Sequence, residues 1–349
     1  MLLLFSVVAG PQGGVQGVNR LVLDAVRTRG LPLSAVSLHD SLSESAVTGS
    51  GGSRLRFTLA ALARRRQAAG STVFATHAGL APVGRLVRGA AAHSRLVVFL
   101  HGVEVWGPLS AFTRWGLRRC DLLIANSHYT LERFRAAHPD LAAIPGEVCP
   151  LPARPLDGGD PGPENPRPPL RVLVVGRLWG RGMRKGQKEL IALWPRILRH
   201  FPGAELWIVG GGPGRAELEQ RAREAGVATA VIFPGEVSDA RLARLYAASD
   251  LYAMPSWGEG FGLVFAEAMA HGLPCIASRL DAGAEVVADG ETGLLVDPED
   301  PEELWAALER LLGDPALRAR LGEAGRRRAR DLYSVERFQT RLTALLEDT

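Results

Sequence analysis

The chain has 349 residues, of which 46% are hydrophobic and 22% charged, so it has the composition of a globular protein and a length that favours about two domains. These values exclude a disordered or fibrous chain, and no stretch approaches the roughly 18 uninterrupted apolar residues of a membrane-spanning helix. Residues 1–168 hold 18 Arg against 11 acidic residues, whereas the whole chain has a net charge of only +4. The basic front half either attracts phosphates, nucleic acid or an anionic membrane, or is an ordinary solvated surface.

The cysteines and the first residues indicate the compartment. Cys120, Cys149 and Cys275 are odd in number and far apart, so we expect neither a disulfide framework nor a zinc site. This favours a reducing, cytoplasmic location. The apolar start, residues 1–10, lacks a basic region and runs into a Gly-rich stretch, which predicts a first buried strand rather than a signal peptide.

Short β-branched or Leu-rich runs alternate with longer stretches of helical period, a pattern typical of repeated βα units around parallel sheets. Nine strands are predicted, at residues 2–8, 72–76, 96–100, 121–125, 171–175, 205–209, 230–233, 250–254 and 274–277.

A Pro- and Gly-rich linker, residues 153–169, separates a Rossmann-like domain of residues 1–152 from a second one of residues 170–330. The helical pattern of residues 331–349 either closes the second domain or packs back on the first. In such α/β domains ligands bind outside the carboxyl ends of the strands, so we expect a cleft between two sets of strand ends.

In the first half, candidate residues follow predicted strands. Gly13 and Gly14 follow the first strand and allow close backbone approach to a ligand, or form an ordinary tight turn. His101 ends a later strand, with Glu104 beside it, and Asn126 and Ser127 end the next one. All are placed where cleft residues lie in parallel sheets.

In the second half, Arg177 and Lys185 follow the strand of residues 171–175 and could supply fixed positive charge to a pyrophosphate. The chain contains only two lysines, Lys185 and Lys188, and both fall in this segment, although Lys188 also fits a solvated helix. The segment lacks the GK[ST] ending of a P-loop, and the Gly-rich turn of residues 209–214 breaks the dinucleotide-binding pattern.

The sharpest motif is residues 258–274, GEGFGLVFAEAMAHGLP, which follows another predicted strand. A helix that begins near Gly262 or Leu263 would direct its first amides and its dipole at an anion such as a diphosphate. Glu259 in the turn and Glu267 inside the helix can then accept hydrogen bonds from sugar or ribose hydroxyls. Alternatively, they are a turn carboxylate and a solvated helix residue.

Together these residues resemble the family-four retaining glycosyltransferases of the GT-B fold. The E-x7-E signature appears as Glu259, GFGLVFA, Glu267, and the GRL…KG element as Arg177 and Lys185 with a longer insert between them. The resemblance covers nearly the whole chain and implies an α/β fold of two Rossmann-like domains that face each other across a cleft.

The resemblance also implies a role for each residue. Glu267 would bind the donor ribose, and Arg177 and Lys185 would neutralise the departing diphosphate. His101, Gly13 and Gly14 would line the first-domain wall, with His101 beside the donor sugar. The transferred sugar would be held by Glu259 and the amides of Gly260, Phe261, Gly262 and Leu263. The base would be cradled by Phe233 to Val237.

The implied reaction moves a hexose from a UDP- or GDP-sugar to a glycan, lipid-linked or small-molecule acceptor, in cell-surface polysaccharide or glycoconjugate synthesis. Charge on the leaving diphosphate would be neutralised by cations and helix N-termini. No DxD metal-binding pair occurs in the chain, so we expect neither a metal nor a cofactor beyond the co-substrate. Glu259 would position the sugar, with front-face transfer and retention of configuration.

Three alternatives remain open. A sugar-nucleotide epimerase has a similar architecture, whereas a phosphorylase would need a pyridoxal lysine. A non-catalytic nucleotide- or nucleic-acid-binding protein would explain the basic half, but stacking motifs are lacking, so no nucleic acid is expected. The basic first domain could also dock peripherally on an anionic membrane to reach a lipid-linked acceptor. The donor base, the acceptor and the linkage cannot be predicted from these residues.

Overall fold

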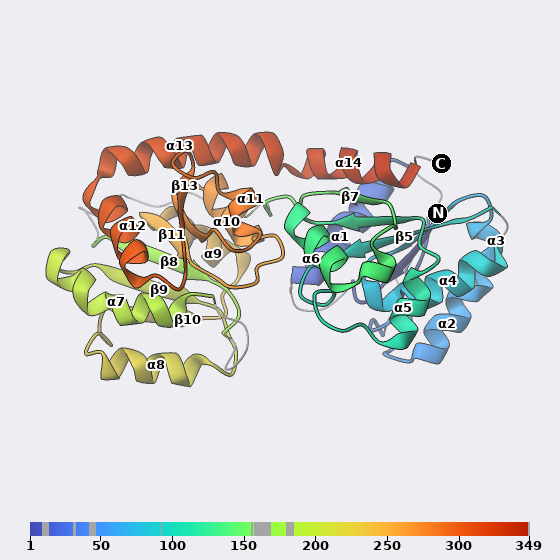
Figure 1. Cartoon of the computed structure of the whole chain (residues 1–349), viewed down its shortest axis with the longest axis horizontal. Coiled ribbons are helices and arrows are strands. Elements are labelled where there is room, and N and C mark those ends of the chain that lie inside the picture. The colour runs from blue at the N-terminus through green and yellow to red at the C-terminus, as the bar shows by residue number, and fades with distance from the viewer. Residues whose placement is uncertain are drawn as a thin grey trace. The chain divides into compact units, whose positions relative to one another are not determined.

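The computed structural model describes residues 1–8, 14–30, 33–41, 47–91, 93–154, 156, 169–178 and 185–347. The chain divides into two compact units, shown in Figure 1. Unit 1 contains Met1–Leu151 and Val335–Thr349, and unit 2 contains Pro152–Ser334. No helix among the described residues is both long enough and apolar enough to cross a membrane.

Unit 1 is built on a seven-stranded sheet of order β3-β2-β1-β4-β5-β6-β7, in which every pair of neighbours is parallel. Parallel strands require crossover connections, and helices supply them between most of these strands. The strands are β1 Leu2–Phe5, β2 Ser34–Ser37, β3 Val47–Gly49, β4 Thr72–Ala75, β5 Arg95–Leu100, β6 Leu122–Ala125 and β7 Gly146–Val148. The helices are α1 Gly14–Thr28, α2 Arg54–Ala63, α3 Arg65–Ala68, η1 Ala78–Leu80, α4 Ala81–Ala90, α5 Ala111–Leu117, α6 His128–Ala137, η2 Pro139–Leu141 and α14 Val335–Glu347.

Unit 2 repeats this plan with a six-stranded parallel sheet of order β10-β9-β8-β11-β12-β13. Its strands are β8 Arg171–Val175, β9 Glu205–Val209, β10 Val231–Gly235, β11 Leu251–Met254, β12 Cys275–Ser278 and β13 Gly293–Val296. Its helices are α7 Gln187–His200, α8 Arg215–Glu224, α9 Asp239–Ala247, α10 Leu263–Ala270, α11 Gly283–Val286, α12 Pro301–Gly313 and α13 Pro315–Leu332.

The C-terminal helix α14 packs on unit 1, which decides between the two placements that the sequence left open (Figure 1). Its last carbonyls accept hydrogen bonds from unit 1 side chains: Thr72 Oγ1 donates to the Leu346 carbonyl at 2.8 Å, and Arg95 Nη2 donates to the Leu345 carbonyl at 3.2 Å. The final carbonyls of a helix lack intrahelical partners, so these bonds satisfy groups that would otherwise need water.

All nine predicted strands occur, but β2, β3, β7 and β13 were not predicted. Each is only three or four residues long, and β3, β7 and β13 form sheet edges. Edge strands pair on one side only and bury less surface, so their sequences need not form the apolar runs that marked the central strands. The sequence of β2, SAVS, is short and half polar and gives no such run.

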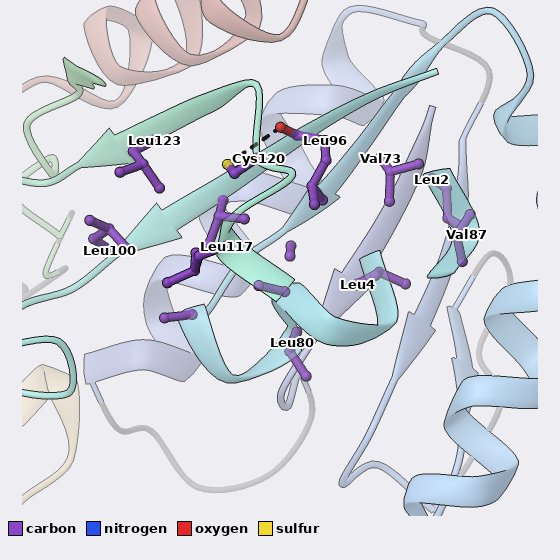
Figure 2. Close-up of a cluster of buried hydrophobic side chains, with 14 of the residues drawn as sticks. Leu2, Leu4, Val73, Leu80, Val87, Leu96, Leu100, Leu117, Cys120 and Leu123 are labelled. Carbon is purple, nitrogen blue, oxygen red and sulfur yellow. Dashed lines mark hydrogen bonds between the residues drawn. The ribbon is translucent and has the colours of Figure 1, made fainter. Parts of the chain in front are cut away.

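A cluster of buried apolar side chains forms a core on one side of the unit 1 sheet, as Figure 2 shows. The Cys120 thiol lies 3.5 Å from the Leu96 carbonyl within this cluster, and burial raises the pKa of Cys120 to about 12, so it is an inert core residue. The side chains labelled in the figure are Leu2, Leu4, Val73, Leu80, Val87, Leu96, Leu100, Leu117, Cys120 and Leu123.

Helices α4 and α5 pack so closely that one position between them tolerates only glycine. A Cβ atom on Gly116 of α5 would lie 2.4 Å from the Pro82 nitrogen of α4, whereas a Cβ on Gly17 of α1 would meet nothing within 4 Å. We expect Gly116→Ala to destabilise the protein by about 1–3 kcal/mol through overpacking. Gly17→Ala should instead stabilise it by about 0.5–1 kcal/mol, since alanine is the better helix former.

Thermal unfolding of the two variants tests this close packing, because 1 kcal/mol shifts the midpoint by about 2–4 °C for a unit of this size. A Gly116→Ala midpoint at or above that of the wild type would contradict it.

Candidate functional site

The order of the unit 2 sheet places its ligand site at one point. Strand β8 lies between β9 and β11, so the connection that leaves β8 toward β9 and the one that leaves β11 toward β12 diverge to opposite sides. Such switch points leave an opening at the carboxyl ends of the two strands, where α/β proteins bind ligands. Arg177 and Lys185 follow β8, and Glu259 follows β11. The topology therefore gathers three of the predicted site residues.

Lys185 and Glu259 form an ion pair. Lys185 Nζ donates to Glu259 Oε2, and the two side chains are only 14% and 20% exposed. This small exposure means that the pair is poorly screened by solvent, unlike most surface ion pairs. Residues 74 positions apart in the chain thus meet at the switch point with opposite charges.

Glycine at position 186 makes this meeting possible. Gly186 has φ +79°, and a Cβ atom there would lie 2.5 Å from Pro255 Cδ and 2.7 Å from the Pro255 carbonyl oxygen. The backbone after β8 therefore touches the backbone after β11 directly. Any larger residue would push Lys185 away from Glu259.

Helix α10 begins at Leu263, as the sequence predicted, directly after the loop that carries Glu259. Gly260, Phe261 and Gly262 are buried in this loop, and Leu263 is partly exposed. The first amides of a helix have no intrahelical acceptor and carry partial positive charge. This helix end and the ammonium of Lys185 thus both lie next to Glu259 at the switch point.

Asp281 supports the loop and was not predicted from the sequence. Its carboxylate accepts hydrogen bonds from the Glu259 amide at 3.0 Å, from Ser256 Oγ at 2.8 Å and from the Gly283 amide at 2.9 Å. Burial raises the pKa of Asp281 to about 6, against these hydrogen bonds, which lower it. The one available signal was its place after β12, the next strand in the sheet.

Glu267 is buried, so it is not the solvated helix residue that one interpretation of the sequence offered. Its side chain is fully buried. Arg154 Nε donates to Oε1, and Tyr246 Oη donates to Oε2 at 3.1 Å. Burial raises the pKa of Glu267, while Arg154 and Tyr246 lower it. Both signature glutamates are therefore paired with a cation of unit 2.

Arg154 is a site residue that the sequence did not reveal. It lies in the segment that we had assigned to the linker, 113 positions before Glu267, and nothing in its neighbourhood marks it. Its Nη1 also donates to Asp239 Oδ1 at 3.3 Å, at the start of α9.

The backbone after β8 also runs along the Gly-rich turn after β9. The Leu178 amide donates to the Gly211 carbonyl at 2.8 Å. A Cβ atom on Gly210 would lie 2.0 Å from the Gly176 carbonyl oxygen, and φ of Gly210 is +133°. These glycines allow two loops to touch, which accounts for a turn that the sequence left unassigned. Arg177 comes directly after β8, and its side chain is exposed.

The segment Phe233 to Val237 includes the carboxyl end of β10, the strand that pairs with β9 at the edge of the sheet. Phe233 and Val237 are partly exposed there. The Gly210 amide donates to the Gly235 carbonyl at 2.9 Å, so this segment adjoins the turn after β9. The structure thus places it on the β9 side of the switch point.

In unit 1, His101 is held by three neighbouring strand ends. Its Nε2 lies 2.7 Å from the Thr76 carbonyl, its amide donates to Glu104 Oε1 at 2.6 Å, and Asn126 Nδ2 donates to its carbonyl at 2.7 Å. Burial lowers the pKa of His101, although Glu104 raises it. A carbonyl only accepts, so Nε2 carries the proton and the neutral ring keeps Nδ1 as an acceptor.

The two predicted glycines of unit 1 have different outcomes. Gly14 is exposed and is the first residue of α1, as expected for a helix N-terminus after the first strand. Gly13 lies outside the described residues.

Comparison with known proteins identifies the family of the chain. A family model described as "Glycosyl transferases group 1" matches residues 169–314, which span the switch point. A GDP-mannose-dependent alpha-(1-6)-phosphatidylinositol monomannoside mannosyltransferase of Mycolicibacterium smegmatis is 35% identical over 294 residues, covering 78% of this chain and 75% of that protein. A GDP-mannose-dependent monoacylated alpha-(1-6)-phosphatidylinositol monomannoside mannosyltransferase of Corynebacterium glutamicum is 32% identical over 275 residues, covering 73% of this chain and 70% of that protein.

Solved structures share the fold. Sucrose-phosphate synthase from Thermosynechococcus elongatus superposes with a TM-score of 0.79 at 24% identity, covering 99% of this chain and 97% of that chain. Anabaena HepE in complex with UDP-glucose gives a TM-score of 0.76 at 22% identity and covers each chain completely. The predictions of a GT-B fold and of a hexosyltransferase are confirmed. The chain belongs to the group 1 glycosyl transferases.

Proposed function

We propose that this enzyme transfers a mannosyl residue from GDP-mannose to a glycolipid acceptor, with retention of the anomeric configuration and without a metal ion. The names of the relatives from Mycolicibacterium smegmatis and Corynebacterium glutamicum support the donor and the acceptor class. The resemblance to family-four enzymes supports retention and metal independence.

The observation that carries the proposal is the ion pair between Lys185 and Glu259 at the switch point. A diphosphate is a stronger partner for an ammonium than a single carboxylate is, because it offers more negative charge and more acceptor oxygens. When it takes Lys185, Glu259 is released to accept hydrogen bonds from sugar hydroxyls. A single ligand that is both anionic and rich in hydroxyls, such as a nucleotide sugar, can therefore bind Lys185 and Glu259 at the same time.

Catalysis then follows from charge. Cleavage of the anomeric bond leaves positive charge on the sugar and negative charge on the diphosphate, so groups that favour the leaving diphosphate accelerate the reaction. Lys185, Arg177 and the N-terminus of α10 are suited to this role. A diphosphate oxygen takes the acceptor proton, and Glu259 positions the sugar. The neutral ring of His101, with Nδ1 as an acceptor, suits a hydrogen bond from a sugar hydroxyl.

The test of function is an assay of the purified chain with GDP-mannose, UDP-glucose and other sugar nucleotides, with and without phosphatidylinositol monomannoside. We expect GDP release and an α-linked mannosyl product from GDP-mannose, detected by NMR, and equal rates with and without EDTA. A β-linked product would refute retention. A new sugar nucleotide formed without acceptor would indicate an epimerase, and salt-sensitive RNA or DNA binding without any turnover would indicate a binding protein.

Substitution of each lysine in turn tests whether the cation at the switch point has a specific role. Lys185→Gln removes the cation at the switch point, and we expect kcat to fall by about 10²–10³, as for the loss of other transition-state donors. Lys188 is the matched control, because it is the only other lysine and pairs with Glu217 on the exposed surface at 2.7 Å. Lys188→Gln should keep kcat within about twofold, since exposed ion pairs contribute little. Equal losses in both variants would argue against the assigned role of Lys185.

A glycolipid acceptor lies in a membrane, and helix α2 of unit 1 is suited to dock on one. Leu55 and Leu59 lie one helical turn apart and are 70% and 58% exposed, whereas Phe57 and Ala61 face the core. Residues 45–103 contain eight arginines and neither Asp nor Glu. Apolar residues flanked by arginines bind anionic lipid surfaces. We therefore propose peripheral docking through α2, at the cytoplasmic face.

Sedimentation with vesicles tests the docking. The wild type should bind vesicles that contain acidic lipid more strongly than neutral ones, and Leu55→Gln with Leu59→Gln should reduce that binding severalfold, because less apolar area is buried. Leu280→Gln is the control, since Leu280 is 46% exposed but lies in unit 2. Equal partitioning of the wild type into both kinds of vesicle would remove the idea.

A further inference from the structure

Arg154 forms an ion pair with the fully buried carboxylate of Glu267, which lies 113 positions further along the chain. Its Nε donates to Glu267 Oε1, and Tyr246 Oη takes the other oxygen at 3.1 Å. Each carboxylate oxygen thus has one fixed donor, which orients the group. A carboxylate buried without a cation would instead take up a proton.

The segment that carries Arg154 is itself fixed. The Ala153 amide donates to the Tyr333 carbonyl at 2.8 Å, and the Tyr333 ring packs edge-on against Phe261 at 5.7 Å. Phe261 belongs to the loop between the two signature glutamates. The segment of Arg154 is therefore anchored against the loop that leads into α10, the helix that carries Glu267.

Arg154 also has a second acceptor. Its Nη1 donates to Asp239 Oδ1 at 3.3 Å, and the Asp239 side chain is 44% exposed. The flexible arginine side chain can shift toward Asp239 and uncover Glu267 without losing an ionic partner.

We propose that Arg154 is a positioning residue of the donor site, which keeps Glu267 ionised and oriented to accept the ribose hydroxyls of the nucleotide. The inference rests on the proposed function, which gives Glu267 its ligand. An ionised carboxylate only accepts hydrogen bonds, so it can serve two hydroxyls, whereas a protonated one spends an oxygen as a donor. Asp239 is the alternative anchor for Arg154 while the ribose is bound.

Replacement of Arg154 should change the pH dependence of nucleotide binding. Burial already raises the pKa of Glu267, and Arg154 lowers it. Arg154→Gln therefore raises that pKa further, so the variant loses affinity as pH falls through a higher value than in the wild type. In titration calorimetry with GDP, we expect binding about tenfold weaker at pH 7, with a loss that shrinks as the pH rises. Arg154→Lys should keep the wild-type pH dependence with a smaller loss.

Two further variants keep the outcome clear. Arg196→Gln removes an arginine from an exposed pair with Glu302 and should match the wild type at every pH. The double variant Arg154→Gln with Glu267→Gln leaves no buried charge, so it should fold even if the single variant does not, and its GDP binding should be weak and independent of pH.

The results separate the inference from the function on which it rests. If the wild type neither binds GDP nor transfers sugar, both fall. If the wild type binds and transfers but Arg154→Gln follows Arg196→Gln at every pH, only the role of Arg154 falls. Tighter GDP binding by Arg154→Gln would also overturn it, because Arg154 would then compete with the ribose.

Discussion

The rest of the site depends on one constraint, which is that a partly buried charge needs a partner of opposite charge. The ion pair between Lys185 and Glu259 satisfies it. Unit 2 meets this need internally. Lys185 pairs with Glu259 and Arg154 with Glu267, each across a long separation in sequence. These pairs compensate both cations and both carboxylates within unit 2.

Sheet topology brings these partners together, and glycine allows the contacts. The order β10-β9-β8-β11-β12-β13 makes the loops after β8 and β11 diverge at adjacent strand ends. Gly186 lets the backbones after β8 and β11 approach closer than a side chain would permit, and Gly210 does the same for the backbones after β8 and β9. Asp281, after β12, fixes the amide of Glu259 from the far side. The ion pair between Lys185 and Glu259 therefore depends on backbone contacts that carry no charge themselves.

The sequence predicted the parts of this arrangement that have a local signature. The central strands are runs of apolar residues, the start of α10 follows from its Gly-rich loop, and Lys185 stands out because lysine is so rare in this chain. The short edge strands were not predicted because their sequences lack a long run of apolar residues. Arg154 was not predicted for a different reason. Its partner, Glu267, is 113 positions away, and nothing in the Pro-rich segment around Arg154 distinguishes it from the many other arginines of the chain.

The paired ground state also has a consequence for catalysis. Under the function proposed above, a donor that binds here separates Lys185 from Glu259, so the energy of the ion pair is subtracted from donor binding. As the anomeric bond breaks, negative charge accumulates on the diphosphate, and its attraction to Lys185 grows, whereas the charge of Glu259 stays constant. The cost of separating the pair is the same in the donor complex and in the transition state, so it lowers donor affinity and kcat/KM alike and does not change kcat. An internal ion pair that opposes the substrate therefore leaves the acceleration of the chemical step intact.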